Sequence, residues 1–417
     1  MKNFPLIKKI NSCRVCKAND FTKVLTFGPT PLANAFLSKE KIDGEEYFYP
    51  LDIYFCNNCN FLTLGHVVSP VELFKDYVYV SSTSKVFINH FKTFSKQIYK
   101  RFKLTEGSLV LDIGSNDGIL LRPFKDLGTK VLGIEPASKI AKLARKEGVE
   151  TISQFFSAQL AKKIVGQYGI VKIATATNVF AHIDDLDEVI RGLDILLDKD
   201  GIFIMEAPHL VDFLEKRYFD LVYHEHLSYW AVSPLVKLFK RFNMTIFDVQ
   251  KVDSHGGSIR VFIKKNEGNF KIEKSVSEFV ESERKKGLNK VDTYIDFGKR
   301  VLQNKMELVT LLTKIKLSNK KIIGYGAPAK GNTLLNYFKI GNEVLDYIID
   351  DSPLKQGLYT PGTHIPVVSP KILDKYKPDY ILILAWNFAQ SIMVKYQSFR
   401  ENGGKFIIPV PIPKIVS

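Results

Sequence analysis

In the middle of the chain, segments with the hydrophobic pattern of a strand alternate with segments that have the hydrophobic pattern of a helix. The segment SLVLDI at 108–113 is a short apolar run typical of a buried strand, and a helical apolar run, ILLRPF, follows it after a glycine-containing turn. Further strands are expected at KVLGIE, in the stretch that ends at Asn178 and at DGIFIMEAPH, with helices near 84–102 and 232–242. Two closely spaced strands, TIFDVQKV and SIRVFIKK, end the series. This pattern predicts an α/β domain built on a mostly parallel sheet.

The last third of the chain repeats the pattern on a smaller scale. Residues 273–317 carry spaced apolar positions among many charges, which predicts one long amphipathic helix. After it, KKIIGYGAPAKGNTLLNYF again reads as strand, turn and helix, with Gly324, Gly326 and Gly331 in or near the turn, and YIIDDSP and DYILILAW supply further strands. We therefore expect a second, smaller Rossmann-like domain. Its GxGxxxxG turn is equally compatible with phosphate binding and with a purely structural role.

The glycine turn at 114–118, GSNDG, indicates which ligand the central domain binds. Gly114 permits a tight turn, and Gly118 is expected to let the backbone approach a ligand. Glu135 ends the next strand, where a carboxylate can accept hydrogen bonds from both ribose hydroxyls, and Asn178 ends a later strand at the same sheet edge. The turn is GxxxG rather than the GxGxxG that seats a pyrophosphate, so it favours a ligand with a ribose and no phosphate, such as S-adenosylmethionine. The final strand pair favours the same cofactor, because class I methyltransferases insert their last strand antiparallel.

All four cysteines lie near the start of the chain, as Cys13-x-x-Cys16 and Cys56-x-x-Cys59, with 39 residues between the pairs. Two thiolates at this spacing form a knuckle that presents both sulfurs to one ion, and two knuckles complete a tetrahedron. Four protein ligands leave no open position, so we expect a structural Zn²⁺ site. Two disulfides are less compatible with a cytoplasmic setting, and rubredoxin-like iron is a weaker alternative because thiolates alone do not select the metal.

Candidate catalytic side chains cluster at 218–229, YFDLVYHEHLSY. His224 and His226 are two residues apart, which does not match the i, i+4 spacing of helical metal ligands, so acid–base chemistry is favoured over a catalytic metal. A histidine titrates near neutrality, and Glu225 or a tyrosine can orient it. His182, just beyond a predicted strand end, is a further candidate on the same edge. Ordinary polar loop residues are the alternative reading of these side chains.

Composition and charge narrow the class of protein. The chain has 417 residues, 25% charged and 12% aromatic, which predicts more than one domain and excludes a disordered or fibrous chain. No apolar run approaches the roughly 18 residues of a membrane helix, and no apolar stretch follows the first lysines as in a secretory signal, so we expect a cytoplasmic protein. The net charge of +15 comes from lysines scattered along the chain. Scattered lysines are typical of a solvated surface or an anionic small ligand, whereas nucleic-acid binding needs a clustered basic stripe with aromatics.

Taken in order, the motifs resemble those of the nucleotide-sugar C-methyltransferase family, whose best-described member acts at C-3 of the sugar in the pathway to D-tetronitrose. The motifs are CxxC…CxxC, YVYVSSTS, LDIGSNDGILL, NVFAHIDDL, YHEHLSYW, SHGGSIRVF and GYGAPAKGNTLLNY. The resemblance covers essentially the whole chain. It implies a zinc-binding domain, here 1–76, an S-adenosylmethionine domain, here 77–272, and a Rossmann-like C-terminal domain with a helical linker, here 273–417.

The resemblance also implies the site residues. The zinc ligands match the four cysteines already named, and His224 has no assigned role. The implied cofactor-binding residues are Asp112, Gly114, Ser115, Asn116, Gly118 and Glu135, to which the strand-end position adds Asn178. The implied active-site residues are Tyr79, His182, Tyr223, Glu225 and His226.

Methylation of a sugar carbon requires an acidic C–H beside a ketone, so the expected substrate is a 4-keto-6-deoxy sugar linked to dTDP or GDP. The resemblance favours His226 as the base, with Glu225 orienting it and Tyr223 or His182 donating to the enolate oxygen. Tyr79 is expected to close the pocket, and Tyr77 is equivalent to it by spacing.

Three further residues are expected to bind the substrate: Lys330 and Arg260 through its phosphates, and His255 in the SHGGS segment. Methylation at C-5 instead of C-3, methylation of a sugar hydroxyl, and an RNA-directed enzyme or nucleic-acid module remain alternatives to C-3 methylation. We expect a monomer or a small homo-oligomer.

Overall fold

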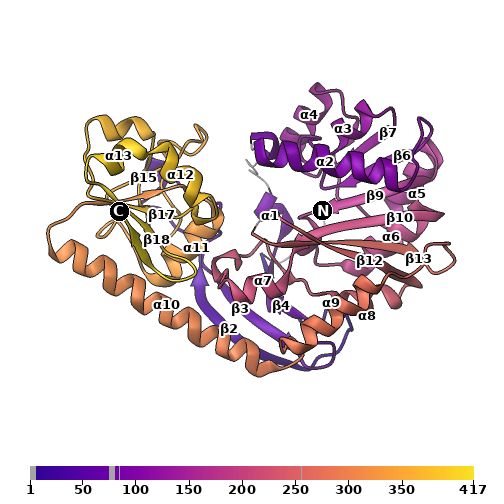
Figure 1. The fold of residues 1–417 in the computed structure, drawn as a ribbon, viewed down its shortest axis with the longest axis horizontal. Coiled ribbons are helices and arrows are strands. Elements are labelled where there is room, and N and C mark those ends of the chain that lie inside the picture. The colour runs from indigo at the N-terminus through magenta and orange to yellow at the C-terminus, as the bar shows by residue number, and fades with distance from the viewer. Residues whose placement is uncertain (1–5, 75–79, 84, 255) are drawn as a thin grey trace.

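The computed structural model describes residues 6–74, 80–83, 85–254 and 256–417 (Figure 1). A large α/β domain lies on the right of the view, a smaller α/β domain on the left and an N-terminal sheet between and below them. The predictions for Tyr77, Tyr79 and His255 lie outside the described residues. Over the described ranges, no helix has both the length and the apolar character needed to cross a membrane.

The N-terminal region forms a four-stranded antiparallel sheet in the order β11-β4-β3-β2. Leu51, Ile53 and Phe55 alternate along β3 and are buried, as expected of a strand with one face on a core. Strand β11 comes from the segment with the candidate catalytic residues, so the middle of the chain completes this sheet. The elements are β1 (Ile7–Lys9), β2 (Phe21–Thr30), η1 (Lys39–Lys41), β3 (Tyr49–Cys56), β4 (Leu62–Leu64), β5 (His66–Val68), α1 (Pro70–Phe74) and β11 (Ser228–Tyr229).

The central domain has a seven-stranded sheet in the order β12-β13-β10-β9-β6-β7-β8. The pairings from β10 to β8 are parallel, whereas β13 is antiparallel to both β10 and β12. The predicted α/β fold and the antiparallel insertion of the last strand are therefore confirmed. The strands are β6 (Leu109–Ile113), β7 (Lys130–Ile134), β8 (Thr151–Ile152), β9 (Val171–Thr177), β10 (Leu197–Pro208), β12 (Met244–Val252) and β13 (Ser258–Lys265).

Helices cover both faces of this sheet because successive strand residues point to opposite sides. On β6, Val110 belongs to the core formed with α2 and α3, whereas Leu109 and Leu111 belong to the core formed with α5, α6 and α8. The helices are η2 (Ser81–Thr83), α2 (Lys85–Arg101), α3 (Leu121–Asp126), α4 (Ser138–Lys146), α5 (Ala158–Tyr168), η3 (Phe180–His182), α6 (Leu186–Leu196), α7 (Leu210–Glu215), η4 (Phe219–Leu221) and α8 (Val232–Lys240).

The prediction of one long helix over 273–317 is wrong. The segment forms two helices, α9 (Lys274–Lys285) and the long α10 (Val291–Leu317), which runs below the molecule in Figure 1. Gly287 lies between them with a φ of +77°, a left-handed conformation that ends α9. The stretch ESERKKG at 281–287 has no apolar side chain, and its basic residues followed by glycine are a helix-end signal that the prediction did not use.

The C-terminal domain has a six-stranded sheet in the order β16-β15-β14-β17-β18-β19, parallel except for the last pair. The predicted second Rossmann-like unit is therefore present. Its elements are β14 (Ile322–Tyr325), α11 (Ala329–Phe338), β15 (Ile348–Ile349), β16 (Val367–Val368), η5 (Pro370–Asp374), β17 (Tyr380–Ile383), η6 (Trp386–Phe388), α12 (Ala389–Lys395), α13 (Gln397–Glu401), β18 (Lys405–Ile408) and β19 (Lys414–Val416).

One hydrophobic core joins the N-terminal sheet, the segment around η4 and the C-terminal domain. Leu51 of β3, Phe219 of η4 and Phe338 of α11 belong to it, and the Phe219 and Phe338 rings stack with centroids 5.2 Å apart. The segment that carries the candidate catalytic residues is therefore fixed between the other two parts of the chain.

Candidate functional site

The four cysteines form a closed thiol cluster. Their Sγ atoms lie within 4.8 Å of one another, with Cys13–Cys59 and Cys16–Cys56 each at 3.6 Å, and none forms a disulfide. The two pairs have the same local turn: the N–H groups of Lys17 and Asn60 donate to the carbonyls of Cys13 and Cys56, both at 2.9 Å, with positive φ at both donors. Two such knuckles fit a tetrahedral Zn²⁺ with four thiolates and no open position.

The first glycine turn follows β6 and is held by main-chain hydrogen bonds. Gly114 (φ +69°) and Ser115 both donate to the carbonyl of Ile134 at the end of β7, at 2.7 and 3.0 Å. A Cβ on Gly114 would lie 2.4 Å from Val179, which explains why only glycine fits. A Cβ on Gly118 would lie 2.9 Å from the Val149 side chain, so Gly118 is required by packing as well as by its φ of +78°. Gly118 therefore has a packing reason, and its expected approach to a ligand stays a prediction.

Glu135 and Asp112 place two buried carboxyl groups beside this turn. Glu135 accepts the N–H of Asn116 at 3.0 Å and that of Ala137 at 2.8 Å, and burial raises its pKa. Burial raises the pKa of Asp112 to about 7, and the charge of Glu135 adds to the rise while a 2.6 Å hydrogen bond from Thr175 opposes it. A carboxylate has about four acceptor positions, so Glu135 keeps capacity for two ribose hydroxyls. Among the described residues, the buried Ser115 Oγ and Asn178 Oδ1 have no hydrogen-bond partner, which also fits a polar ligand at this edge.

His182 and His226 meet at the carboxyl edge of the central sheet. Asn178 ends β9 with a φ of +58° and donates its N–H to the Glu206 carbonyl at 2.8 Å, and η3 then carries His182. The rings of His182 and His226 lie edge to face with centroids 4.9 Å apart. Burial lowers the pKa of His182 to about 4, so this ring is neutral at pH 7.

Tyr223 and His226 form a hydrogen-bonded pair with a defined tautomer. Nδ1 of His226 lies 2.7 Å from the carbonyl oxygen of Leu221, which can only accept, so Nδ1 carries a proton. Nε2 lies 2.8 Å from the Tyr223 hydroxyl and in the neutral ring accepts its proton. The two rings lie close together, with centroids 4.0 Å apart. The pair presents a basic imidazole nitrogen with a phenol attached to it.

The expectation that Glu225 orients His226 is corrected by this arrangement, because the Leu221 carbonyl holds the Nδ1 atom. Glu225 instead accepts a 2.6 Å hydrogen bond from the Asn34 side chain in the N-terminal region. Burial raises the pKa of Glu225 to about 7, against the lowering effect of Asn34. Glu225 is therefore a carboxyl group that can carry a proton at neutral pH.

His224 has a structural role that the sequence did not indicate. Its Nε2 lies 3.2 Å from the Tyr49 carbonyl on β3, and its side chain is 2% exposed. Burial lowers its pKa to about 4. His224 therefore fastens the segment between Tyr223 and His226 to the N-terminal sheet as a neutral ring.

Lys330 lies where the C-terminal domain meets the central segment. Its Nζ is 3.7 Å from the centroid of the Trp386 ring and 2.5 Å from Asn387 Oδ1. The Trp386 indole N–H donates to Asp220 of η4 at 2.5 Å. Burial lowers the pKa of Lys330 to about 8, opposed by the charge of Asp220, and burial raises the pKa of Asp220 to about 6. Lys330 is a cation at neutral pH in a position between two domains.

Arg260 lies apart from Lys330. It faces Glu206 across the β10–β13 pair, donates to it at 3.0 Å and to Gln97 at 3.2 Å, and its guanidinium lies 4.1 Å from the Phe94 ring centroid. His90 of α2 bonds the same Glu206 carboxylate at 2.9 Å. Arg260 is 4% exposed and already paired, so the expectation that it binds a phosphate is not supported.

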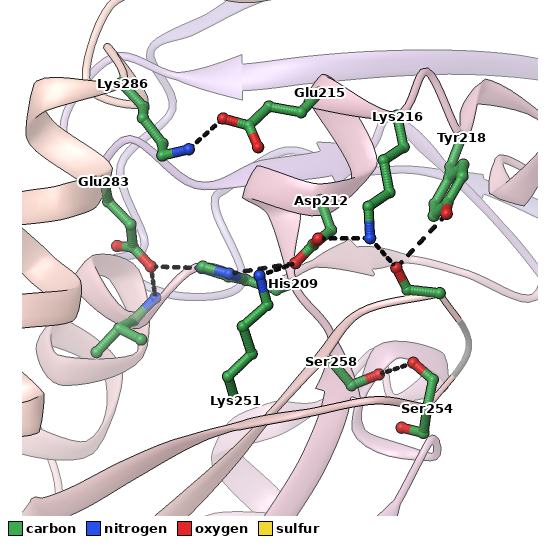
Figure 2. A network of polar contacts seen from close by, with 12 residues as sticks. His209, Asp212, Glu215, Lys216, Tyr218, Lys251, Ser254, Ser258, Glu283 and Lys286 are labelled. Carbon is green, nitrogen blue, oxygen red and sulfur yellow. Dashed lines mark hydrogen bonds and ion pairs between the residues drawn. The ribbon is translucent and has the colours of Figure 1, made fainter. Parts of the chain in front are cut away.

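Side chains on and just after α7 contact the main chain at Gly256 (Figure 2). Lys216 pairs with Asp212 at 2.8 Å and donates to the Gly256 carbonyl, and the Tyr218 hydroxyl lies 3.5 Å from the same oxygen. A Cβ on Gly257 would lie 2.4 Å from the Asp212 carboxyl carbon. The two glycines of SHGGS therefore have a packing reason, and the predicted role of His255 stays a prediction.

Sequence reasoning missed Asn34, Leu221, Asp220 and Trp386. Asn34 and Asp220 are each more than 160 residues from the partner that gives them a role, at separations of 191 and 166 residues. Leu221 acts through its carbonyl oxygen, which no side-chain motif can reveal.

Three successive parts of the chain match known domain families. Residues 13–74 match a zinc binding domain, 89–249 a methyltransferase domain and 253–411 a C-methyltransferase C-terminal domain. The C-methyltransferase NovU of Streptomyces niveus is 37% identical over 412 residues, which cover 99% of this chain and 98% of NovU.

Other relatives match a smaller share of the chain. The ubiquinone biosynthesis O-methyltransferase of Bordetella avium (strain 197N) is 34% identical over 101 residues, 23% of this chain and 41% of the relative. Among solved structures, magnesium protoporphyrin IX methyltransferase of Synechocystis PCC 6803 with bound SAH is 16% identical. The match covers 46% of this chain and 92% of the matched chain, with a TM-score of 0.36.

Proposed function

Because the chain belongs to the C-methyltransferase family and is an S-adenosylmethionine-dependent enzyme of it, we propose that it methylates C-3 of a 4-keto-6-deoxy sugar linked to a nucleoside diphosphate. The observation that carries this proposal is the Tyr223–His226 pair. Its tautomer, fixed by Leu221, leaves an imidazole nitrogen ready to receive a proton at the sheet edge where the cofactor residues lie.

Carbon methylation requires a carbanion-like carbon. A 4-keto group makes C-3 and C-5 acidic through an enolate, so the enzyme has to remove one proton and stabilise the oxygen of the enolate. When bound, S-adenosylmethionine supplies the electrophilic methyl group that this carbon accepts. The candidate residues on the chain, Glu135, Asn116 and Asp112, would hold that cofactor beside β6 and β7.

His226 acts as the base in this proposal. The C-3–H bond breaks, the proton passes to the Tyr223–His226 pair and ends on Nε2, and the electron pair forms the enolate. Once Nε2 is protonated it donates to the Tyr223 oxygen, so the Tyr223 hydroxyl is released to donate to the enolate oxygen. Glu225, whose pKa lies near 7, is a second donor when protonated, and neutral His182 packs against the charged imidazolium.

The nucleoside diphosphate has a candidate partner in Lys330. This lysine begins α11 directly after the second glycine turn, and it is a cation held between two domains. Neighbouring main-chain N–H groups at this helix start add to the attraction for an anion. The net positive charge of the chain is compatible with an anionic ligand of this kind.

C-5 methylation of the same substrate class is the alternative, because the ketone activates both carbons. A sugar O-methyltransferase would use the same cofactor edge and needs no ketone, and the family argues against it. Exchange of the sugar C–H into heavy water in the absence of cofactor separates the carbon and oxygen cases. The NMR position of the exchanged proton separates C-3 from C-5.

The test is a mass-shift screen of dTDP- and GDP-linked 4-keto-6-deoxy sugars with S-adenosylmethionine, repeated with His226→Asn. We expect wild-type protein to add one methyl group and His226→Asn to lose about 10³-fold or more in turnover while its affinity for S-adenosylhomocysteine is unchanged. His66→Asn, a histidine in β5 of the N-terminal region, is the control and should turn over normally. Wild-type turnover by His226→Asn would remove His226 from the mechanism.

A further inference from the structure

We propose that Asn34, in the loop between the two cysteine pairs, is a positioning residue for Glu225, so that the zinc-binding region contributes directly to the active centre. This inference rests on the proposed function, which places Glu225 among the acid–base groups. The contact that carries it is the 2.6 Å hydrogen bond from the Asn34 amide to Oε1 of Glu225.

Glu225 needs such a partner because its carboxyl group is buried. The residue is 6% exposed, and a buried carboxyl without a donor is free to rotate and to lose its charge. The amide N–H can only donate, so it fixes Oε1 as an acceptor and leaves Oε2 as the atom that carries the proton. The burial-raised pKa of Glu225, near 7, is consistent with this assignment.

The loop that carries Asn34 is held by the C-terminal domain. The buried side chain of Asn332 on α11 donates to the Ala33 carbonyl at 2.7 Å. Leu37 and Tyr359 exchange two main-chain hydrogen bonds, of 3.0 and 2.8 Å. The loop is therefore fixed on one side by the C-terminal domain and presents Asn34 to Glu225 on the other.

Glu46, near the other end of the connection between β2 and β3, adds to this anchoring. Its carboxylate accepts the N–H of Gly362 at 2.7 Å and bonds His364 at 2.9 Å, both in the C-terminal domain. A movement of the N-terminal region or of the C-terminal domain would displace the Asn34–Glu225 contact, because both ends of the loop are bound to folded elements.

The experiment is a double-mutant cycle with Asn34→Leu and Glu225→Gln, using dTDP-4-keto-6-deoxyglucose and S-adenosylmethionine as probes. Leucine keeps the shape of asparagine and removes the donor. We expect Asn34→Leu to lower kcat by about 10- to 100-fold with the KM for S-adenosylmethionine unchanged, since the hydrogen bond that fixes Oε1 of the buried Glu225 carboxyl group is lost. In the Glu225→Gln background the same change should have little further effect. Asn269→Leu, whose amide donates to the Asp200 carboxylate at 3.2 Å on the surface of the central domain, is the matched control and should leave kcat unchanged.

A second measurement needs no substrate. In protein labelled with ¹³C at glutamate carboxyl carbons, the Glu225 resonance is identified by its absence in Glu225→Gln. It should shift in Asn34→Leu and in the smaller variant Asn34→Ala, and stay in place in Asn269→Leu. Melting temperatures show whether each variant is folded.

The outcomes separate the two proposals. Wild-type kcat in Asn34→Leu, effects that multiply independently in the cycle, or an unmoved Glu225 resonance would overturn the role of Asn34. Full turnover by Glu225→Gln would overturn the roles of both residues. If wild-type protein methylates no sugar nucleotide but the resonance shifts, the proposed substrate is wrong and the Asn34–Glu225 contact stands.

Discussion

The central and C-terminal domains each contain a strand, a glycine turn, a helix and a second strand that ends in an acid. In the central domain Glu135 accepts the N–H of Asn116 in the turn at 3.0 Å and that of Ala137, two residues after itself, at 2.8 Å. In the C-terminal domain Asp350 accepts the N–H of Ala327 in the turn at 2.7 Å and that of Ser352, again two residues on, at 2.8 Å. The same local device therefore closes both turns.

The charges around the two turns differ. The central turn has a second buried acid, Asp112, whose charge and that of Glu135 disfavour each other. The C-terminal turn has lysines instead: Lys355 donates to the Ala327 carbonyl at 2.8 Å beside Asp350, and Lys330 follows the turn. An acidic edge suits ribose hydroxyls and a cationic sulfonium, and a basic edge suits phosphates. One supersecondary unit thus appears twice, and the proposed function assigns the two turns different ligands according to a few charged side chains.

The largest effect is expected from the acidic edge. Glu135→Gln keeps the size of the side chain but loses the charge and one acceptor oxygen. We expect the affinity for S-adenosylhomocysteine, measured by calorimetry, to fall about 100-fold, as two charge-assisted hydrogen bonds to the ribose are weakened. Glu147→Gln, on the exposed end of α4, should leave the affinity unchanged. An unaltered affinity in Glu135→Gln would contradict the difference proposed between the two turns, since Glu135 and Asp350 would then both be purely structural.

The basic edge should show a smaller effect on a different ligand. Lys330→Ala removes the cation next to the second turn, so the KM for the sugar nucleotide should rise about tenfold while that for S-adenosylmethionine stays the same. Lys375→Ala, an exposed lysine of the same domain, is the control. Equal KM values for wild type and Lys330→Ala would return the C-terminal turn to a structural role.

The smallest and most discriminating effect is the opposite pH dependence of the two edges. The pKa of Asp112 lies at about 7, so its negative charge is present above that pH and is lost as the pH falls. Because this charge attracts the sulfonium, S-adenosylmethionine should bind about fourfold more weakly at pH 6.5 than at pH 8. The pKa of Lys330 lies at about 8, so its positive charge is present below that pH and is lost as the pH rises. Because this charge attracts the phosphates, the sugar nucleotide should bind about fourfold more weakly at pH 8.5 than at pH 7.

Two calorimetric titrations check this prediction. The neutral S-adenosylhomocysteine should lose less affinity than the cofactor at low pH, because it lacks the sulfonium charge. The alkaline loss for the sugar nucleotide should be absent in Lys330→Ala. Parallel pH profiles for both ligands would contradict the assignment of opposite charges to the two edges.

Much of the fold and part of the site followed from local sequence. The spacing of Cys13, Cys16, Cys56 and Cys59 predicted one closed thiolate cluster, and the structure brings all four sulfurs together. The strand–turn–helix pattern predicted both glycine turns, and Glu135 is only 19 residues from the Asn116 N–H that it accepts. The break at Gly287 was not predicted, although the basic residues and glycine of ESERKKG at 281–287 mark a helix end.

The arrangement of the catalytic segment depended on distant parts of the chain. His226 is fixed by its neighbour Leu221, but Glu225 is set by Asn34, 191 residues away, and the loop of Asn34 is held by Asn332, 299 residues from the carbonyl that it bonds. Arg260 looked like a phosphate ligand until the β10–β13 register placed it opposite Glu206.

The sequence alone therefore determined the units that a short stretch of chain can close by itself: the two cysteine knuckles and the two glycine turns. Each is stabilised by hydrogen bonds between residues near one another in the chain, so its residue types and spacing suffice to predict it. Only the tertiary structure decided which polar groups share a buried environment around Glu225, Lys330 and Arg260. Burial and the partners present there set the charge of each group, and both depend on packing between all three parts of the molecule.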